Sequence, residues 1–191
     1  MARFSLAAAA AFVNGLYGDW LDDDPVAITQ NPDVPCENLG SLFVNLSSVL
    51  SNDFWGTPLA APQSHLSFRP VTTFSFRLQH CLMGFHSVGF HIANVLLHAI
   101  VTALFHGVLS QLTALRKSQR SFAALLFALH AVHVECVTNV VGRAELLSAV
   151  AAFSALLIYA PLVIQPPAPV LETLVRSFFA QALAALAMLG P

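Results

Sequence analysis

The stretch VGFHIANVLLHAIVTALFHGVLSQL spans residues 88–112. It carries no Asp, Glu, Lys or Arg, and it is long enough to cross a bilayer, which takes roughly 20 mostly apolar residues. Four of its polar residues recur at spacings of three and four and so share one helical face: His91, Asn94, His98 and Thr102. We predict a transmembrane helix whose polar face points into the protein. That face either satisfies hydrogen bonds between helices or contacts a ligand.

The composition of the whole chain is that of an all-α integral membrane protein. Of its 191 residues, 57% are hydrophobic and 9% are charged, and the mean hydropathy is +0.71. A formal net charge of -2 gives no reason to expect nucleic-acid binding. The basic residues are scattered, apart from Arg116, Lys117 and Arg120. By the positive-inside rule this trio places its connection in the cytoplasm and the preceding loop on the opposite side.

The apolar runs divide the chain into eight segments. We expect a first transmembrane helix, truncated at its start, at 1–17, a luminal loop at 18–87, a helix at 88–112, a cytoplasmic loop at 113–120, a helix with a luminal turn at 121–145, a helix at 146–164, a cytoplasmic Pro-rich linker at 165–176 and the start of another helix at 177–191. The first segment has a second interpretation as a cleaved signal peptide.

Two features are expected within the long luminal loop. Apolar residues at helical spacing predict an amphipathic helix over residues 42–50 that lies on the membrane face. Asn45-Leu46-Ser47 is a glycosylation sequon, which is usable where the loop is extracytoplasmic. The cysteines show neither zinc-site spacing nor the density of a disulfide scaffold. Cys36 and Cys81 pair only if the loop is in an oxidising compartment, and Cys136 is then left over.

An acidic stretch, Gly18-Asp19-Trp20-Leu21-Asp22-Asp23-Asp24, opens the luminal loop. Four carboxylates so close together beside a membrane indicate a site that handles a proton, a cation or a developing positive charge. Two other interpretations stay open. The stretch is either a solvated junction between helix and loop, or part of a divalent-metal site completed by His and Glu.

A second group of polar residues follows the third hydrophobic run. His130 and His133 share a helical face, whereas Glu135 lies about 140° around the helix from His130, so the three meet only if the helix bends or ends there. Arg143 follows shortly after. We expect these residues near the luminal surface, on the same side as Asp23 and Asp24. An alternative function, a polytopic transporter of protons or metal ions, would use the histidines at 91, 98, 130 and 133.

The acidic stretch, together with Ala27-Ile28 and Asn31-Pro32-Asp33-Val34, resembles the opening luminal motif of the transmembrane and tetratricopeptide-repeat O-mannosyltransferases, the TMTC family. Further matches are Asn52-Asp53-Phe54-Trp55-Gly56, Phe68-Arg69-Pro70, Gly89-Phe90-His91 and Val141-Gly142-Arg143-Ala144-Glu145. The resemblance covers about residues 12–160. The family usually has Pro where Ala131 and Ser87 stand, and Tyr where Phe68 stands.

This resemblance implies a glycosyltransferase of the GT-C type, a helical bundle in the membrane of the endoplasmic reticulum. Such an enzyme transfers mannose from dolichyl phosphate mannose to Ser or Thr of secretory-pathway proteins, cadherins among them. Its partners are the dolichol-linked donor, the acceptor proteins and membrane lipid, and the resemblance leaves its metal dependence open. Because further helices and the tetratricopeptide repeats are not visible here, we expect no activity from this chain alone.

The resemblance also implies roles for the two polar groups. We expect Asp23 or Asp24 to take the proton of the acceptor hydroxyl, with Asp19 in reserve. The second carboxylate would raise the pKa of its neighbour by like-charge repulsion. The donor phosphate would face His130, His133 and Arg143, because a guanidinium offers paired donors to phosphate oxygens. Glu135 would orient one of the histidines.

Overall fold

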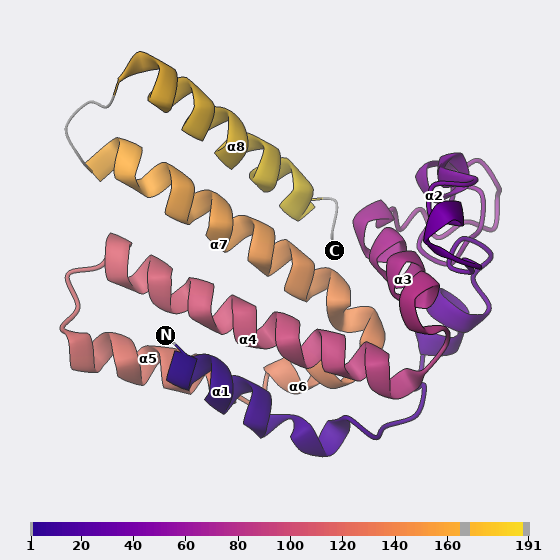
Figure 1. Ribbon diagram of the computed structural model, residues 1–191, viewed down its shortest axis with the longest axis horizontal. Coiled ribbons are helices and arrows are strands. Elements are labelled where there is room, and N and C mark those ends of the chain that lie inside the picture. Colours follow the sequence, from indigo (N-terminus) through magenta and orange to yellow (C-terminus); the bar gives the residue numbers. More distant parts are fainter. Residues whose placement is uncertain (1, 165–168, 189–191) are drawn as a thin grey trace.

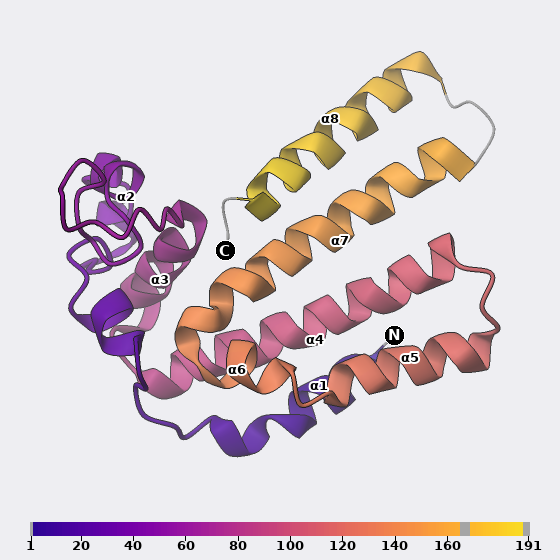
Figure 2. The same ribbon diagram turned by 180° about the vertical axis from the view of Figure 1, so that it is seen from behind.

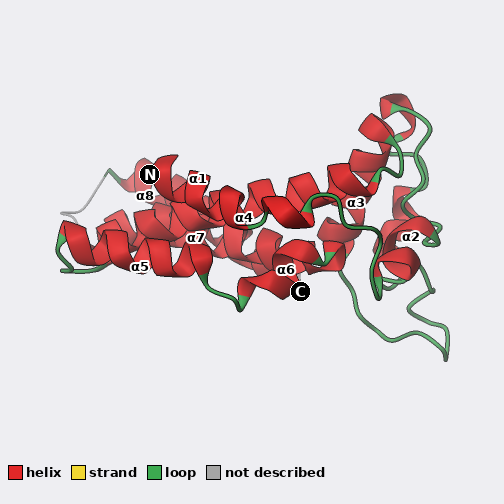
Figure 3. Ribbon diagram, turned by 90° about the horizontal axis from the view of Figure 1, so that it is seen from below, coloured by secondary structure: helices red, strands yellow, loops and turns green. Residues whose placement is uncertain are grey.

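The computed structural model describes residues 2–164 and 169–188, and every regular element in those ranges is a helix (Figure 3). The eight α-helices are α1 (Ala2–Ala11), α2 (Leu46–Ser51), α3 (Pro70–Met83), α4 (Ser87–Leu112), α5 (Lys117–Leu129), α6 (His133–Thr138), α7 (Arg143–Ile164) and α8 (Val170–Met188). Short helical turns are η1 (Val13–Gly15), η2 (Pro25–Thr29), η3 (Leu39–Ser41) and η4 (Val140–Gly142).

The long helices form a bundle, and α2 and α3 form a lobe beyond one of its ends (Figures 1 and 2). We call residues 18–86 the lobe. Helix α4 starts beside the lobe and leads away from it, α5 returns, α7 leads away again and α8 returns. Among the described residues, three segments are by length and composition able to cross a membrane: Ser87–Leu112, Val140–Leu162 and Val170–Ala187. The prediction of an all-α membrane protein is confirmed.

The C-terminal helix differs from the sequence expectation. Helix α8 begins at Val170, inside the range expected to be an extended linker. Pro169 is compatible with this start, because a proline before the first helical turn removes no hydrogen bond that the helix needs. Its carbonyl accepts a bond from the amide of Thr173 at 3.0 Å. The rest of the linker prediction at 165–168, and the end of the last segment at 189–191, lie outside the described residues.

The segment expected as a helix with a luminal turn over 121–145 consists of two helices and a short helical turn. Helix α5 ends at Leu129, His130 is extended (ψ 131°), and α6 restarts at His133. The amide of Val132 donates to Nδ1 of His130 at 3.1 Å, so the side chain of His130 stabilises the break. The chain thus turns at this point although Ala131 stands where the family usually has a proline. Glu135 and His133 thereby belong to a separate short helix.

Helix α3 lies within residues 18–87, which we expected to form a luminal loop. It starts with Pro70 in its first turn and ends at Gly84, whose φ of 66° suits glycine. Its buried face includes Thr72, Arg77 and Gln79, and this polar content hides the helix from a search for apolar runs. The amphipathic helix expected over 42–50 is also shorter, since α2 starts at Leu46.

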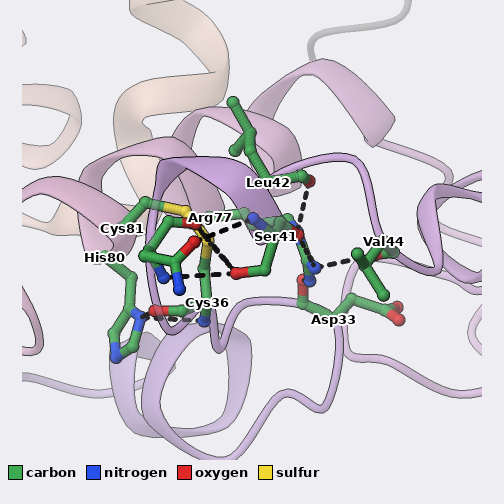
Figure 4. The surroundings of a disulfide bond; sticks show 9 residues. Asp33, Cys36, Ser41, Leu42, Val44, Arg77, His80 and Cys81 are labelled. Carbon is green, nitrogen blue, oxygen red and sulfur yellow. Dashed lines mark hydrogen bonds between the residues drawn. A yellow bond between two sulfur atoms is a disulfide. The ribbon is translucent and has the colours of Figure 1, made fainter.

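Arg77 and a disulfide tie the chain over residues 33–44 to α3 (Figure 4). The buried guanidinium of Arg77 donates to four backbone carbonyls, those of Asp33, Ser41, Leu42 and Val44, at 2.8–3.2 Å. Cys36 pairs with Cys81 near the end of α3, and Cys136 is free. The amide of Cys36 also donates to Nδ1 of His80 at 2.9 Å. These contacts hold this part of the lobe against α3.

An apolar cluster joins the lobe to the bundle. Its buried members are Ala27, Ile28, Val34, Phe54, Phe76, Phe90 and Val140. Ala27 and Ile28 follow the acidic stretch, whereas Phe90 belongs to α4 and Val140 to η4. Burial of this much apolar surface fixes the acidic stretch over the junction between α6 and α7. The lobe is thereby positioned at the end of the bundle where α4 and α7 begin (Figure 1).

Candidate functional site

A polar pocket lies where the acidic stretch meets α6 and the start of α7. Its volume is about 500 Å³. Its polar lining residues are Asp23, Arg69, His133, Glu135, Asn139 and Glu145, with Val132, Cys136, Val141 and Gly142 completing the wall. The lining residues come from three separate parts of the sequence. We call this cavity the polar pocket.

Asp24 anchors the acidic stretch to the start of α7. Its side chain is fully buried, and its carboxylate accepts hydrogen bonds from the amides of Val141 at 2.9 Å, Leu21 at 3.2 Å and Val140 at 3.4 Å. Burial raises the pKa of Asp24, and these backbone donors only partly oppose that effect. Because its oxygens accept these backbone hydrogen bonds, Asp24 fixes the acidic stretch to the start of α7.

The other acidic residues of the stretch are exposed. Asp23 lines the polar pocket, directly next to the anchored Asp24. Asp19 accepts a hydrogen bond from the amide of Trp20 at 2.9 Å. Asp22 adopts a positive φ of 44°, which allows the chain to turn between Leu21 and Asp23. The three consecutive aspartates therefore have three different environments: a turn, a pocket wall and a buried anchor.

His133 forms the inner wall of the pocket. Its ring centroid lies 4.9 Å from that of His98, 6.5 Å from that of His130 and 4.4 Å from that of Phe127. Burial lowers the pKa of His133, and the neighbouring His98 and His130 lower it further. The imidazole is therefore neutral near pH 7, with one nitrogen to donate and one to accept a hydrogen bond. Glu135 is exposed in the same pocket wall.

Arg143 makes its hydrogen bonds and ring contacts inside the protein. Its Nε donates to Oδ1 of Asn94 at 3.0 Å and its Nη2 to the carbonyl of Phe90 at 3.2 Å. The guanidinium also stacks over Phe76 and Phe90, at 4.7 and 5.2 Å from the ring centroids. Arg143 thus binds α7 to α4 and α3. It is 2% exposed, which leaves little of its surface to a ligand.

Arg69 is the cationic side chain that sequence reasoning did not select for the site. It lines the polar pocket, and its carbon Cζ lies 4.9 Å from the ring centroid of Phe54. Its Nε is buried and has no hydrogen-bond partner among the described residues. The available signal was its position in Phe68-Arg69-Pro70, one of the segments that match the TMTC family.

The polar face of α4 lies inside the bundle, with His91, Asn94, His98 and Thr102 each at most 2% exposed. Nδ2 of Asn94 donates to the carbonyls of Asn139 and Val140 at 3.1 and 3.3 Å. Nε2 of His98 is 3.1 Å from the carbonyl oxygen of Ala128. Asn94 and His98 thus connect α4 to the segments before and after α6. Both ring nitrogens of His91 lack such partners within the described ranges.

Comparison with known proteins identifies the chain. It is 42% identical over 152 residues to the mouse protein named Protein O-mannosyl-transferase TMTC3, covering 79% of this chain and 16% of that protein. The human Protein O-mannosyl-transferase TMTC4 is 42% identical over 156 residues, covering 74% of this chain and 20% of that protein. The chain belongs to the TMTC family. The fruit fly Protein O-mannosyl-transferase Tmtc3 is 37% identical over 174 residues, or 81% of this chain and 18% of its own length.

This TMTC chain spans about one fifth or less of the length of these relatives. No family model matches it. No solved structure matches it either. The resemblance stated from the sequence is confirmed at the level of the family. The relatives' names give no support to the alternative function of a proton or metal transporter.

The structure brings some of the expected TMTC site residues together and separates others. Asp23, His133 and Glu135 share the polar pocket, whereas His130 lines a different cavity beside α5. Asn45 is exposed immediately before α2. Within the described ranges, no group of three or more His, Cys, Asp or Glu side chains is arranged to hold a metal ion.

Proposed function

We propose that the polar pocket is the catalytic centre of a protein O-mannosyltransferase that uses dolichyl phosphate mannose as donor. The observation that carries this proposal is the placement of Asp23. Its carboxylate lines an open pocket because Asp24 is fixed to the amides of Val140 and Val141. The names of the relatives support the reaction class, and the pocket supplies the groups that such a reaction needs.

Asp23 is the base in this proposal. A Ser or Thr hydroxyl of the acceptor gives its proton to the carboxylate of Asp23 while its oxygen forms a bond to C1 of mannose. The bond between C1 and the phosphate oxygen breaks, and dolichyl phosphate leaves with the electron pair. Asp24 is less suited to be the base, because its oxygens accept backbone hydrogen bonds and its side chain is buried. It serves to hold Asp23 in place.

Arg69 and His133 are the groups that would bind the phosphate. Arg69 lines the pocket and its buried Nε has no hydrogen-bond partner among the described residues. A guanidinium makes paired, charge-assisted hydrogen bonds to phosphate oxygens. His133, neutral for the reasons given above, donates one hydrogen bond. Arg143 contributes indirectly, because it fixes α7 against α4. Stabilising the charge that develops on the leaving phosphate lowers the barrier for transfer.

The proposed location is the membrane of the endoplasmic reticulum, with the polar pocket on the luminal side. The Cys36–Cys81 disulfide lies in the lobe next to the pocket, and disulfides persist in oxidising compartments. Arg116, Lys117 and Arg120 lie at the other end of α5, which agrees with a cytoplasmic position for that end. The acceptors would be secretory-pathway proteins, cadherins among them, because such proteins pass through this compartment.

A chimera tests the function. The matching segment of mouse TMTC3 is replaced by this chain, and transfer of labelled mannose from dolichyl phosphate mannose to an acceptor is measured in membranes. Asp23→Asn removes the base, and we expect transfer to fall by about 10²–10⁴-fold. The matched control is Asp22→Asn, an exposed neighbour in a left-handed turn that Asn tolerates. Full transfer by Asp23→Asn, with normal membrane insertion, would remove the assignment.

A further inference from the structure

Positive charge gathers at the end of the bundle where α5 begins, away from the lobe (Figure 1). Arg3 lies in the first turn of α1, and Arg120 lies in the first turn of α5, just after Arg116 and Lys117. Helix α1 contains no Asp or Glu, and residues 54–134, which include α4 and α5, contain none either. Since α1, α4 and α5 pack together, the cations have no carboxylate on the helices that carry them or on α4.

The two arginines flank the same part of α4. The carbon Cζ of Arg3 lies 4.9 Å from the ring centroid of Phe4, and that ring lies 4.9 Å from the ring of His106. One turn further along α4, the carbonyl of Ser110 accepts a hydrogen bond from Nη1 of Arg120 at 3.2 Å. The guanidinium groups of Arg3 and Arg120 are therefore held on either side of the C-terminal part of α4.

A groove lies between these arginines and the outer side of α5. Its volume is about 340 Å³, and it is lined by Arg3, Phe4, Ser121, Phe122 and Leu125. We call it the basic groove. Phe4 is buried at its base, whereas Phe122 is 69% exposed. Ser121 comes directly after the second arginine of the site. The basic groove thus joins a cationic end to an apolar, open wall.

This combination restricts what can occupy the basic groove. Its occupant needs an anionic group beside the two guanidinium groups and an apolar chain against Phe122 and Leu125. Arginine makes charge-assisted hydrogen bonds to phosphate oxygens, and its long side chain can keep the charge at the membrane surface. Phosphatidylcholine carries a cation of its own, which the arginines would repel. A free phosphate ion has nothing to place against the apolar wall.

We propose that the basic groove is a binding site for an anionic phospholipid, with the headgroup phosphate between Arg3 and Arg120. One acyl chain lies along Phe122 and Leu125. By the positive-inside rule this end of the bundle faces the cytoplasm, and the cytoplasmic leaflet is the one rich in anionic lipids. Basic pockets between membrane helices on that side hold anionic headgroups. The site is at the opposite end of the bundle from the polar pocket, so it does not depend on the proposed reaction.

Photo-crosslinking tests the basic groove. In the full chain, Phe122 is replaced by a benzophenone-bearing phenylalanine, and the protein is placed in phosphatidylcholine vesicles. A radiolabelled tracer, either phosphatidylserine or phosphatidylcholine, is present at the same mole fraction. We expect phosphatidylserine to label position 122 about 25-fold more than phosphatidylcholine, because each of two cations contributes about fivefold. The control position is Phe178 of α8, which is 67% exposed, and there the ratio should be near one. Equal ratios at the two positions would overturn the proposal.

Charge variants separate a site from a diffuse surface charge. Arg3→Gln and Arg120→Gln should each lower the ratio at position 122 about fivefold, with labelling at position 178 unchanged as the check of normal insertion. The matched control is Arg176→Gln, which removes a cation that already pairs with Glu172. We expect no change in this variant. An equal fall in all three variants would show that net charge alone attracts the lipid, and the site would be withdrawn.

A filling variant tests the apolar wall while all charges remain. Ser121→Phe places a ring in the basic groove and should lower the ratio at position 122 toward one. Its matched control is Ala123→Phe on the same helix, which fills a different cavity and should leave the ratio unchanged. Excess unlabelled phosphatidylserine should displace the tracer, and inorganic phosphate should not. An unchanged ratio in Ser121→Phe, or equal displacement by inorganic phosphate, would contradict a phospholipid site.

Discussion

The lobe and the bundle are stabilised in different ways. In the lobe, single polar side chains hold several backbone groups: Arg77 donates to four carbonyls, and Asp53 accepts from three amides and a hydroxyl. In the bundle, long apolar helices pack along their lengths, and α4 contacts α1, α5 and α7. The polar pocket therefore lies between a polar lobe, which a disulfide and hydrogen bonds stabilise, and a bundle of membrane-embedded helices.

This difference follows from the surroundings of each region. Helices in a bilayer satisfy their backbone hydrogen bonds internally, so an apolar sequence is sufficient to define them. A loop region in water must compensate buried carbonyls and amides with specific partners. The lobe therefore depends on a few residues, and changes to those residues should affect it much more than the bundle.

The largest expected effect comes from the disulfide. Replacing both Cys36 and Cys81 with Ser opens a link across a sequence separation of 45 residues. Loss of that constraint should lower the free energy of unfolding of the lobe by about 4 kcal/mol. Hydrogen exchange of the amides of α3 would measure this loss of stability, with the amides of α7 as the internal control. Equal loss of protection in α3 and α7 would mean that lobe and bundle unfold as one unit.

Gly142→Ala should destabilise the contact between α6 and α7, which forms the bundle side of the polar pocket. A methyl group at this position would lie 2.5 Å from Cα of Cys136 and 2.8 Å from its carbonyl oxygen. Backbone atoms cannot rotate away, so we expect destabilisation of about 2 kcal/mol by overpacking. The matched control is Gly107→Ala, whose methyl group would meet only the movable tip of Leu157. Thermal unfolding in detergent compares the two, and equal midpoints would contradict this account of the α6–α7 contact.

Asp53→Asn should have the smallest effect, and it should depend on pH. Burial acts to raise the pKa of Asp53, but hydrogen bonds from Ser64, Thr57, Trp55 and His65 outweigh it and lower the pKa. A carboxyl whose pKa is lower in the folded state stabilises the protein above its unfolded pKa of about 4 and loses that contribution as the pH falls.

The neutral side-chain amide of this variant would accept fewer hydrogen bonds than the carboxylate of Asp53, so the lobe should lose about 1–2 kcal/mol at pH 7. The difference from the wild type should shrink below about pH 4, where the carboxyl of the wild type becomes protonated. Hydrogen exchange of the amides of α3 as a function of pH measures this difference in stability. Asp22→Asn, at an exposed position, serves as the control. A difference that is constant from pH 7 to pH 3 would show that ionisation of Asp53 does not contribute.

The sequence predicted the parts of the fold that depend on apolar periodicity. The helix over residues 88–112 and its inward polar face follow from composition and spacing alone. Helix α3 was missed because most of its buried residues are polar, and one of them, Arg77, bonds to loop carbonyls distant in sequence. The α5–α6 break was left open by the sequence, because it depends on a local contact between His130 and Val132 rather than on a proline.

The sequence also predicted part of the candidate site, but not all of it. The density of carboxylates and the proximity of His133 and Glu135 were visible in the sequence. The division of labour between Asp23 and Asp24 was not, because it depends on amides more than 110 residues away. Arg69 was not selected either, since a single arginine in a long loop carries no periodic signal. Only tertiary contacts distinguish these side chains from one another.

The most direct test of the account is the proximity of the acidic stretch to α6. Asp23→Cys and Glu135→Cys are combined in a Cys136→Ser background, and a short, membrane-impermeant bismaleimide is added from the luminal side of oriented vesicles. The two positions line one pocket, so we expect them to become crosslinked. Single variants that label from opposite sides of the membrane, or that label from one side but never crosslink, would contradict a shared centre.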